Sequence, residues 1–374
     1  MKIERIHAFD SIRAIMMILG VFLHTALSYG DLEYSGWPLY NSKEGHLFFD
    51  WIFGIIHIFR MPIFFIISGF FGALLFYKKS PSQMILNRIK RVLLPFIVFI
   101  FILTPLNNIA LKYSMPLFLN PKEDILLFDI IKSLNPHNFL PYKSTYHLWF
   151  LYYLMMFSIL TPFIFKLLKT GASFIKYFNK ILSNKYFSML MLSSLTYIII
   201  YFSGNTWIDA STSFIPNPHA FIFHLFFYLF GWMIFISKRW IEYFSKSGWQ
   251  EIIISTLLFS FLFIEYERFD SSLIILIHSL AVWGFCFGFL GLFIKHINKQ
   301  NLLLRYISDS SYWIYLLHLP LTLFLPGLLV NYLLPIGLKF SIVVLITLTT
   351  CLSTYHFFVR KTFIGMFLNG RKFK

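Results

Sequence analysis

Long apolar runs recur along nearly the whole chain, and they constrain its fold more than any other feature does. Runs near 20 residues match the roughly 30 Å hydrocarbon core of a bilayer. Backbone polar groups in lipid must be bonded within the segment, so such runs form helices. The sequence therefore predicts an all-α, polytopic transmembrane bundle of about ten helices, at residues 11–30, 52–77, 92–111, 147–168, 186–203, 219–236, 250–266, 273–294, 311–330 and 336–358.

The composition excludes most soluble classes of protein. Of the 374 residues, 58% are apolar and 13% are charged, whereas soluble proteins carry about 25% charged residues. The same apolar content excludes a disordered chain. Cys286 and Cys351 lie inside apolar runs, so we interpret them as buried apolar residues rather than as a disulfide, a zinc site or a redox pair.

The distribution of basic residues predicts the orientation of the chain. A formal net charge of +16 would suggest a nucleic-acid partner in a soluble protein. Here the basic residues follow the positive-inside pattern, which predicts that both termini are cytoplasmic and that the partner is the lipid bilayer, with no nucleic acid. Of the 32 Lys and Arg residues, 24 fall in alternating segments, at 1–13, 78–91, 166–185, 238–246, 295–305 and 360–374.

The chain is predicted to form a single domain over residues 1–374. No internal repeat is visible, and no linker rich in Gly, Ser or Pro divides it. Lys2 and Arg5 precede the first apolar run, as in a signal peptide. Because Asp10 and Arg13 interrupt that run and no clear small-x-small site follows, we expect an uncleaved membrane helix.

Ionisable residues line one face of this first helix, and each is costly in lipid and therefore suggests function. Arg13 and His24 are eleven residues apart, which on a helix is about three full turns and about 16 Å along the axis. Asp10 would pair with Arg13 at i,i+3 near the cytoplasmic mouth. His24 fits a general base or, equally, a histidine that bonds between helices. The same face also carries Met17, Gly20 and Ser28.

The second apolar run holds a buried cation and closely spaced small residues. Arg60 precedes Pro62 within the run, so it needs a partner or a wet cavity. The small residues form two small-xxx-small pairs, which predict close helix packing. The pairs are Ser68 with Gly72 and Gly69 with Ala73.

Two arginines stand three residues apart in NRIKRVLLP, before the third run. Arg88 and Arg91, with Lys90 between them, would present two guanidinium groups able to grip a phosphate. The plainer interpretation is an ordinary positive-inside loop.

Histidines also recur in the later runs. His147 stands at the outer mouth of the fourth run, and Ser311, Tyr315 and His318 share one helical face. No HxxxH or HExxH spacing occurs, so no metal is expected. We interpret the remaining intramembrane histidines as packing residues, namely His57, His224, His278 and His356.

Five stretches resemble, in order, successive signatures of the membrane-bound acyltransferase 3 family, and they cover nearly the whole chain. They are FDSIRAIMMILGVFLH, RMPIFFIISGFF, RIKRVLLPF, HLWFLYYL and SDSSYWIYLLHLP. The second stretch and the C-terminal FVRKTFIGMFLNGRK are most similar to the branch that succinylates osmoregulated periplasmic glucans. The IFFIISGFF core is also common in the O-acetyltransferases of the family.

The resemblance implies an acyl-CoA-dependent O-acyltransferase of the bacterial inner membrane. Succinyl-CoA or acetyl-CoA would be the cytoplasmic co-substrate, with no tightly bound cofactor, and a periplasmic or surface glycan would be the acceptor. The Arg-x10-His motif of the family matches Arg13 and His24, and its RxxR motif matches Arg88 and Arg91.

This resemblance also implies a mechanism. Arg88 and Arg91 would hold the phosphates of CoA while the pantetheine arm carries the thioester along the first helix to His24. His24 would act as general base or as acyl carrier, with Asp10 and Arg13 organising the entrance. Weaker substrate-binding candidates are His147, His318 and, for a succinyl carboxylate, Arg60.

Two other classes of protein compete with this interpretation. A transporter or exporter of a glycan or an acylated small molecule would also bury charges, but no inverted repeat or matched pair of broken helices is apparent. A passive scaffold leaves the shared face of Arg13 and His24 unexplained. Glycan-synthesis enzymes are candidate partners, and the sequence does not set the oligomeric state.

Overall fold

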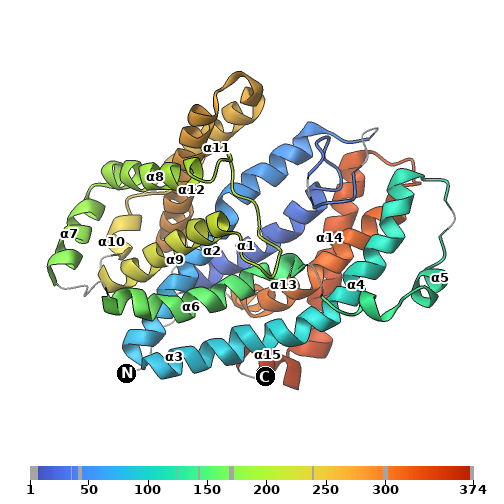
Figure 1. Cartoon of the computed structure of the whole chain (residues 1–374), viewed down its shortest axis with the longest axis horizontal. Helices are drawn as coiled ribbons and strands as arrows, with labels where there is room; N and C mark the ends of the chain where they lie inside the picture. Colours follow the sequence, from blue (N-terminus) through green and yellow to red (C-terminus); the bar gives the residue numbers. More distant parts are fainter. Residues whose placement is uncertain are drawn as a thin grey trace. The chain divides into compact units, whose positions relative to one another are not determined.

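The computed structural model of the chain describes residues 7–34, 36–40, 44–123, 125–141, 144–167, 172–237, 240–297 and 302–370. In these ranges the regular structure is helical throughout, without β-strands, which confirms the predicted all-α class (Figure 1). The α-helices are α1 (His7–Ala26), α2 (Leu47–Lys78), α3 (Pro81–Arg88), α4 (Leu94–Leu119), α5 (Leu127–Lys132), α6 (Trp149–Leu167), α7 (Ala172–Ser183), α8 (Lys185–Tyr201), α9 (Pro218–Ser237), α10 (Trp240–Phe244), α11 (Trp249–Ile264), α12 (Ser271–His296), α13 (Leu302–Leu329), α14 (Ile336–Thr354) and α15 (Phe363–Asn369).

In the described ranges, ten apolar helical segments overlap the ten predicted runs. By length and composition, eight segments in the described ranges are able to cross a membrane. The other two, α8 and α11, are shorter apolar helices of 17 and 16 residues. The chain is therefore a multi-pass membrane protein. The positive-inside orientation of its termini stays a prediction.

Helix ends follow local sequence signals. The hydroxyl of Ser80 accepts a hydrogen bond from the backbone N–H of Gln83 at 3.2 Å, and Pro81 occupies the first helical position of α3. The carboxylate of Asp270 caps α12 in the same way, accepting from the N–H of Ser272 at 3.1 Å. These caps place two helix starts where side chains satisfy otherwise unbonded backbone donors.

The third span differs from the predicted run at 92–111. Helix α3 continues through a π-helical segment, η1 (Ile89–Leu93), into α4, so one apolar stretch covers Pro81–Leu119. A second π-helical segment, η5 (Tyr355–Val359), follows α14. Such segments are rare and often mark functional sites, and apolar periodicity alone does not reveal them.

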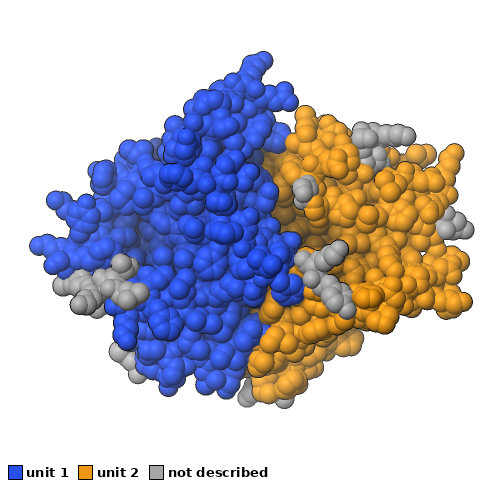
Figure 2. All heavy atoms as spheres, viewed as in Figure 1, with its two compact units in different colours: residues 1–13, 58–93, 149–305 blue, residues 14–57, 94–148, 306–374 orange. Residues whose placement is uncertain are grey.

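The chain divides into two compact units, coloured separately in Figure 2. Unit 1 comprises residues 1–13, 58–93 and 149–305, and unit 2 comprises residues 14–57, 94–148 and 306–374. The boundaries fall inside α1, α2 and α13 and at the start of α4 and α6. The prediction of one domain over residues 1–374 stays a prediction, and each unit is described by itself below.

Unit 1 is built on close helix contacts made by small residues. A Cβ added at Gly69 of α2 would collide with the carbonyl oxygen of Tyr228 in α9. A Cβ at Gly231 of α9 would collide in turn with the carbonyl of Ile66 in α2. The close packing predicted from the small-xxx-small pattern is thereby confirmed for Gly69. In the same unit, α12 packs against both α11 and α8 (Figure 1).

In unit 2, a buried hydrogen bond links α4 to α13. The hydroxyl of Ser114 donates to the carbonyl of Leu323 at 2.7 Å, and Gly327 of α13 meets the same serine. An apolar cluster, here called the unit 2 core, consists of the buried Leu39, Ala110, Phe118, Leu319 and Leu323, with Trp37, Tyr146 and Val330 among the residues packed on it. The two cysteines, Cys286 in unit 1 and Cys351 in unit 2, are buried and unpaired, as predicted.

Candidate active site

Three histidines from separate parts of the sequence meet inside unit 2. His24 lies near the end of α1, His147 in the short helix η3 (Tyr146–Leu148), and His318 in α13. The ring centroid of His318 is 5.2 Å from that of His24 and 5.2 Å from that of His147. His147 and His318 are buried. These three residues are called the histidine cluster below.

A tryptophan that the sequence analysis did not single out covers His24. The indole of Trp37 stacks on the His24 ring, with centroids 5.6 Å apart and planes 23° apart. Its Nε1–H donates to the hydroxyl of Ser28 at 3.1 Å, which fixes the ring over the imidazole. Trp37 lies in an irregular loop, where no helical period could connect it with His24.

Backbone contacts set the tautomers of the other two rings. Nδ1 of His318 lies 2.7 Å from the carbonyl oxygen of Tyr315 and 3.0 Å from that of Ile314. Carbonyl oxygens only accept, so Nδ1 carries the hydrogen, and Nε2 is the proton-accepting nitrogen of the neutral ring. Nε2 of His147 likewise donates to the carbonyl of Leu316 at 3.2 Å, which leaves Nδ1 as its proton acceptor.

The backbone beside His147 is strained and tightly held. Tyr146 has φ 48°, in the left-handed region that bulky residues rarely adopt. Its N–H donates to the hydroxyl of Ser144 at 2.9 Å, and its phenol donates to Oδ1 of Asn108 at 2.8 Å. Tyr315 donates to the carbonyl of His147 at 2.8 Å. Strain of this kind is kept where surrounding contacts fix a functional geometry.

The cluster brings together the basic ring nitrogens of three histidines. A neutral imidazole can take a proton from a hydroxyl, and adjacent imidazoles can pass that proton on. No group of three or more His, Cys, Asp or Glu side chains that could hold a metal ion occurs among the described residues. The arrangement therefore suits acid–base chemistry on a hydroxyl substrate.

The other predicted site residues lie in unit 1. Arg13 pairs with Asp10 at 3.9 Å, as the i,i+3 spacing predicts. Both belong to the first part of α1, where the Arg13 side chain is 40% exposed and that of Asp10 is 16% exposed.

The two arginines of the RxxR motif have different surroundings. Arg88, the last residue of α3, is buried, and its Nη2 donates to the carbonyl of Ser68 in α2 at 3.1 Å. Arg91 is half-buried and lies inside the π-helical segment η1. The two residues therefore straddle a change of helical pitch, which the i,i+3 spacing alone does not reveal.

The remaining predicted cation is Arg60 in the middle of α2. Its Nη2 lies 3.8 Å from the sulfur of Met61, and the side chain is half-buried in unit 1. The structure thus brings His24, His147 and His318 together in unit 2. It places Asp10, Arg13, Arg60, Arg88 and Arg91 in unit 1.

Comparison with known proteins identifies the class of protein to which this chain belongs. The family model described as an acyltransferase domain, that of acyltransferase 3, matches residues 6–356. The chain belongs to this family and is therefore a membrane acyltransferase. The resemblance inferred from the five sequence stretches is confirmed.

Its relatives include the proteins called glucans biosynthesis protein C. Those of Escherichia coli strains SMS-3-5 and K12/DH10B are each 28% identical to this chain over 342 residues, covering 86% of it and 83% of the relative. The protein of Shigella dysenteriae serotype 1 is similar to the same extent, with 28% identity over 342 residues. No solved structure matches the chain.

Proposed function

We propose that this protein transfers an acyl group, succinyl or acetyl, from cytoplasmic acyl-CoA to a hydroxyl of a periplasmic or surface glycan. Membership of the acyltransferase family supports the reaction class. The name of its relatives, glucans biosynthesis protein C, supports a glucan as the acceptor. A transporter is the less favoured candidate, because the family is defined by acyl transfer.

The observation that carries the proposal is the histidine cluster around His24. His24 takes the proton of the acceptor hydroxyl while that oxygen attacks the thioester carbonyl. The tetrahedral intermediate collapses, the carbon–sulfur bond breaks, and the thiolate of CoA leaves and recovers the proton. His318, 5.2 Å from His24 between ring centroids, offers a second basic nitrogen to hold that proton during the step.

An acyl-histidine on His24 is the other route for the same transfer. The ring nitrogen would attack the thioester first, and the acceptor hydroxyl would then remove the acyl group from it. The stacked indole of Trp37 fits either route because it fixes the plane of the imidazole. Trapping a base-labile acyl group on His24 after mixing with acyl-CoA alone would distinguish the two.

The proposed location is the bacterial inner membrane, with both termini in the cytoplasm. The positive-inside pattern supports this orientation. It puts the start of α1, with Asp10 and Arg13, on the donor side and His24 further along the same helix. Arg88 and Arg91 follow α2 and are assigned to the phosphates of CoA on that side.

A direct assay tests the proposal. Purified protein in lipid nanodiscs is mixed with succinyl-CoA or acetyl-CoA, with or without periplasmic glucan that lacks acyl substituents. We expect release of CoA thiol that depends on the glucan, together with a base-labile ester on the glucan. Thiol release that is the same without glucan, or uptake of glucan without thiol release, would contradict the proposal.

The two arginines give a testable prediction for the donor. Arg91→Lys and Arg88→Lys keep the positive charge but lose the planar fork that binds phosphate bidentately. We expect each to raise the KM for acyl-CoA about 10-fold with little change in kcat. The measurement is initial-rate kinetics at varied acyl-CoA. An unchanged KM would show that Arg88 and Arg91 do not bind the donor phosphates and are ordinary basic residues of the positive-inside pattern.

His318 gives a separate prediction for the chemical step. His318→Gln keeps a polar side chain but removes the basic nitrogen, so kcat should fall about 10- to 100-fold. The KM for acyl-CoA should stay within about twofold of the wild-type value, because the donor phosphates are assigned elsewhere. Parallel loss of binding and rate would instead show a merely structural role for His318.

A further inference from the structure

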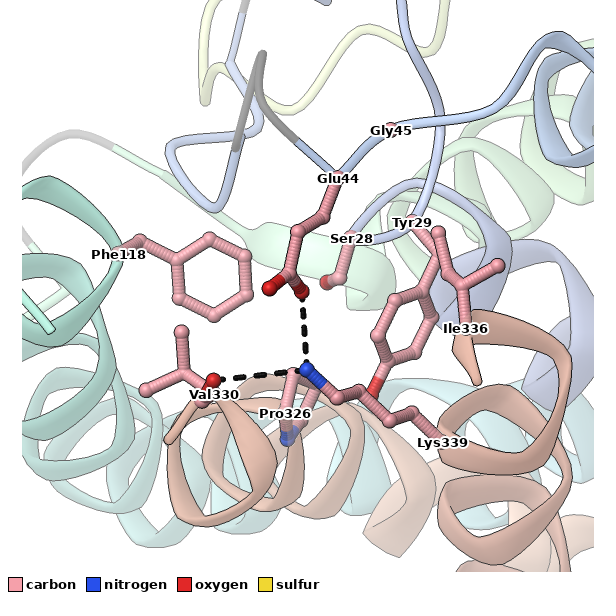
Figure 3. A pocket seen from close by; sticks show the side chains of 9 residues that line it. All are labelled: Ser28, Tyr29, Glu44, Gly45, Phe118, Pro326, Val330, Ile336 and Lys339. Carbon is pink, nitrogen blue, oxygen red and sulfur yellow. Dashed lines mark hydrogen bonds and ion pairs between the residues drawn. The ribbon is translucent and has the colours of Figure 1, made fainter. Parts of the chain in front are cut away.

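A small pocket opens inside unit 2, at the turn that follows α1, and its lining is mostly apolar with two charged groups. Figure 3 shows it at the end of α1, with walls from the ends of α4 and α13 and the start of α14. Ser28 and Tyr29 form one side and Phe118 the other. Its charged groups are Glu44 and Lys339, which point toward each other.

Lys339 is a buried cation with an exposed partner. Its ammonium donates to Oε2 of Glu44 at 2.9 Å and to the carbonyl of Val330 at 3.4 Å. The Lys339 side chain is 3% exposed, whereas that of Glu44 is 51% exposed. The cation is thus buried in the protein, while the carboxylate opposite it is half exposed.

A purely structural role does not account for this pair. Desolvating a lysine is expensive, and apolar residues of similar volume often serve packing as well or better. Lys339 also lies in an apolar helix able to cross the membrane, where an ionisable side chain suggests a functional site. The arrangement offers a buried ammonium that can donate hydrogen bonds to a carboxylate from outside the chain.

The pocket is joined to His24 by two direct connections. Ser28, which lines the pocket, lies four residues after His24, in the turn just beyond the end of α1. Ser28 also holds Trp37, the ring that stacks on His24. The unit 2 core supports both places, because Phe118 and Val330 line the pocket and Trp37 packs on the same cluster.

We infer that Lys339 binds the free carboxylate of a dicarboxylic acyl group, such as succinyl, whose thioester carbonyl lies at His24. This rests on the proposed function. Three carbon–carbon bonds separate the two carbonyl carbons of succinyl by about 4 Å. An ammonium contact of about 3 Å extends that reach to about 7 Å. The substrate carboxylate takes the place of Glu44.

This assignment gives unit 2 its own cation for the acyl group. Arg60, the cation considered for this role from the sequence, lies in unit 1. Acetyl has no carboxylate, so its transfer needs no such cation. The protein is therefore expected to prefer succinyl-CoA over acetyl-CoA, and the preference is expected to depend on Lys339.

The test compares the two donors in purified full-length protein with unsubstituted periplasmic glucan. Lys339→Met should lower kcat/KM for succinyl-CoA about 10- to 100-fold and leave that for acetyl-CoA within about twofold. Glu44→Gln removes the competing charge and should lower the KM for succinyl-CoA about threefold. Lys112→Met, a half-buried lysine of α4 outside the pocket, should change neither donor.

Each other outcome has a definite meaning. An unchanged donor ratio in Lys339→Met, or an equal loss for both donors in folded protein, overturns the inference and leaves the acyltransferase proposal standing. A wild-type protein that transfers acetyl and not succinyl also overturns the inference and leaves the acyltransferase proposal standing. Transfer of neither group overturns the proposed function itself. If Lys339→Met does not fold, the Glu44→Gln result decides, and an unchanged KM overturns the inference.

Discussion

Replacing His24 with Ala should reduce acyl transfer at least about 100-fold, because a positioned general base contributes two to four orders of magnitude. The protein should still fold, since the substitution removes a side chain near the end of α1 without adding bulk. The measurement is glucan-dependent release of CoA thiol by purified protein. His24→Gln, which keeps most of the volume, should be equally inactive.

A matched control is available in the same unit. His356 is exposed in η5, its Nδ1 lies 3.3 Å from the hydroxyl of Tyr306, and its ring contacts the rings of Tyr306 and Phe357. His356→Gln should keep the wild-type rate. Substantial transfer by His24→Ala, with thermal stability like that of the wild type, would show that His24 is neither the general base nor the acyl carrier.

The second large effect concerns the packing of α2 on α9 in unit 1. Gly231→Leu places a side chain where the carbonyl of Ile66 already lies, so two helix backbones would have to separate. We expect a destabilisation of about 3 kcal/mol or more, the upper part of the range for overpacked cores. Detergent-solubilised protein should aggregate or show a markedly lower Tm.

The same substitution at an open glycine controls for the cost of leucine itself. Gly337 in the first turn of α14 has no heavy atom within 4 Å of an added Cβ. Gly337→Leu should therefore fold like the wild type. A Gly231→Leu protein with an unchanged Tm would contradict the close approach of Gly231 in α9 to the carbonyl of Ile66 in α2.

The overall helical fold was predictable because bilayer thickness imposes a length on each apolar run. Helices α8 and α11 closely match their predicted runs, whereas the third run merged with the segment before it through η1. Apolar periodicity does not distinguish an α-helical turn from a π-helical turn. The i,i+3 spacing of the RxxR motif assumes an ideal α-helix, whereas Arg91 lies in the π-helical segment η1.

The sequence indicates His24, His147 and His318 as separate candidates, but it does not indicate that they assemble. Helical spacing put His24 on a polar face and His318 on the face of Tyr315, yet nothing local indicated that α1, η3 and α13 bring three histidines together. Trp37 and Lys339 were missed for the same reason. Each gains its meaning from neighbours far away in the sequence, namely His24 for the indole and Glu44 for the ammonium.

The central claim is that His24 transfers an acyl group to a glycan, and mass spectrometry of glucans tests it most directly. The host is an Escherichia coli strain that lacks its own glucans biosynthesis protein C and expresses either this protein, His24→Ala or His356→Gln. We expect a base-labile acyl ester on the glucans with the wild type and His356→Gln and none with His24→Ala. The added mass separates succinyl from acetyl. The same ester in the His24→Ala strain, or no ester with any of the three, would contradict the claim.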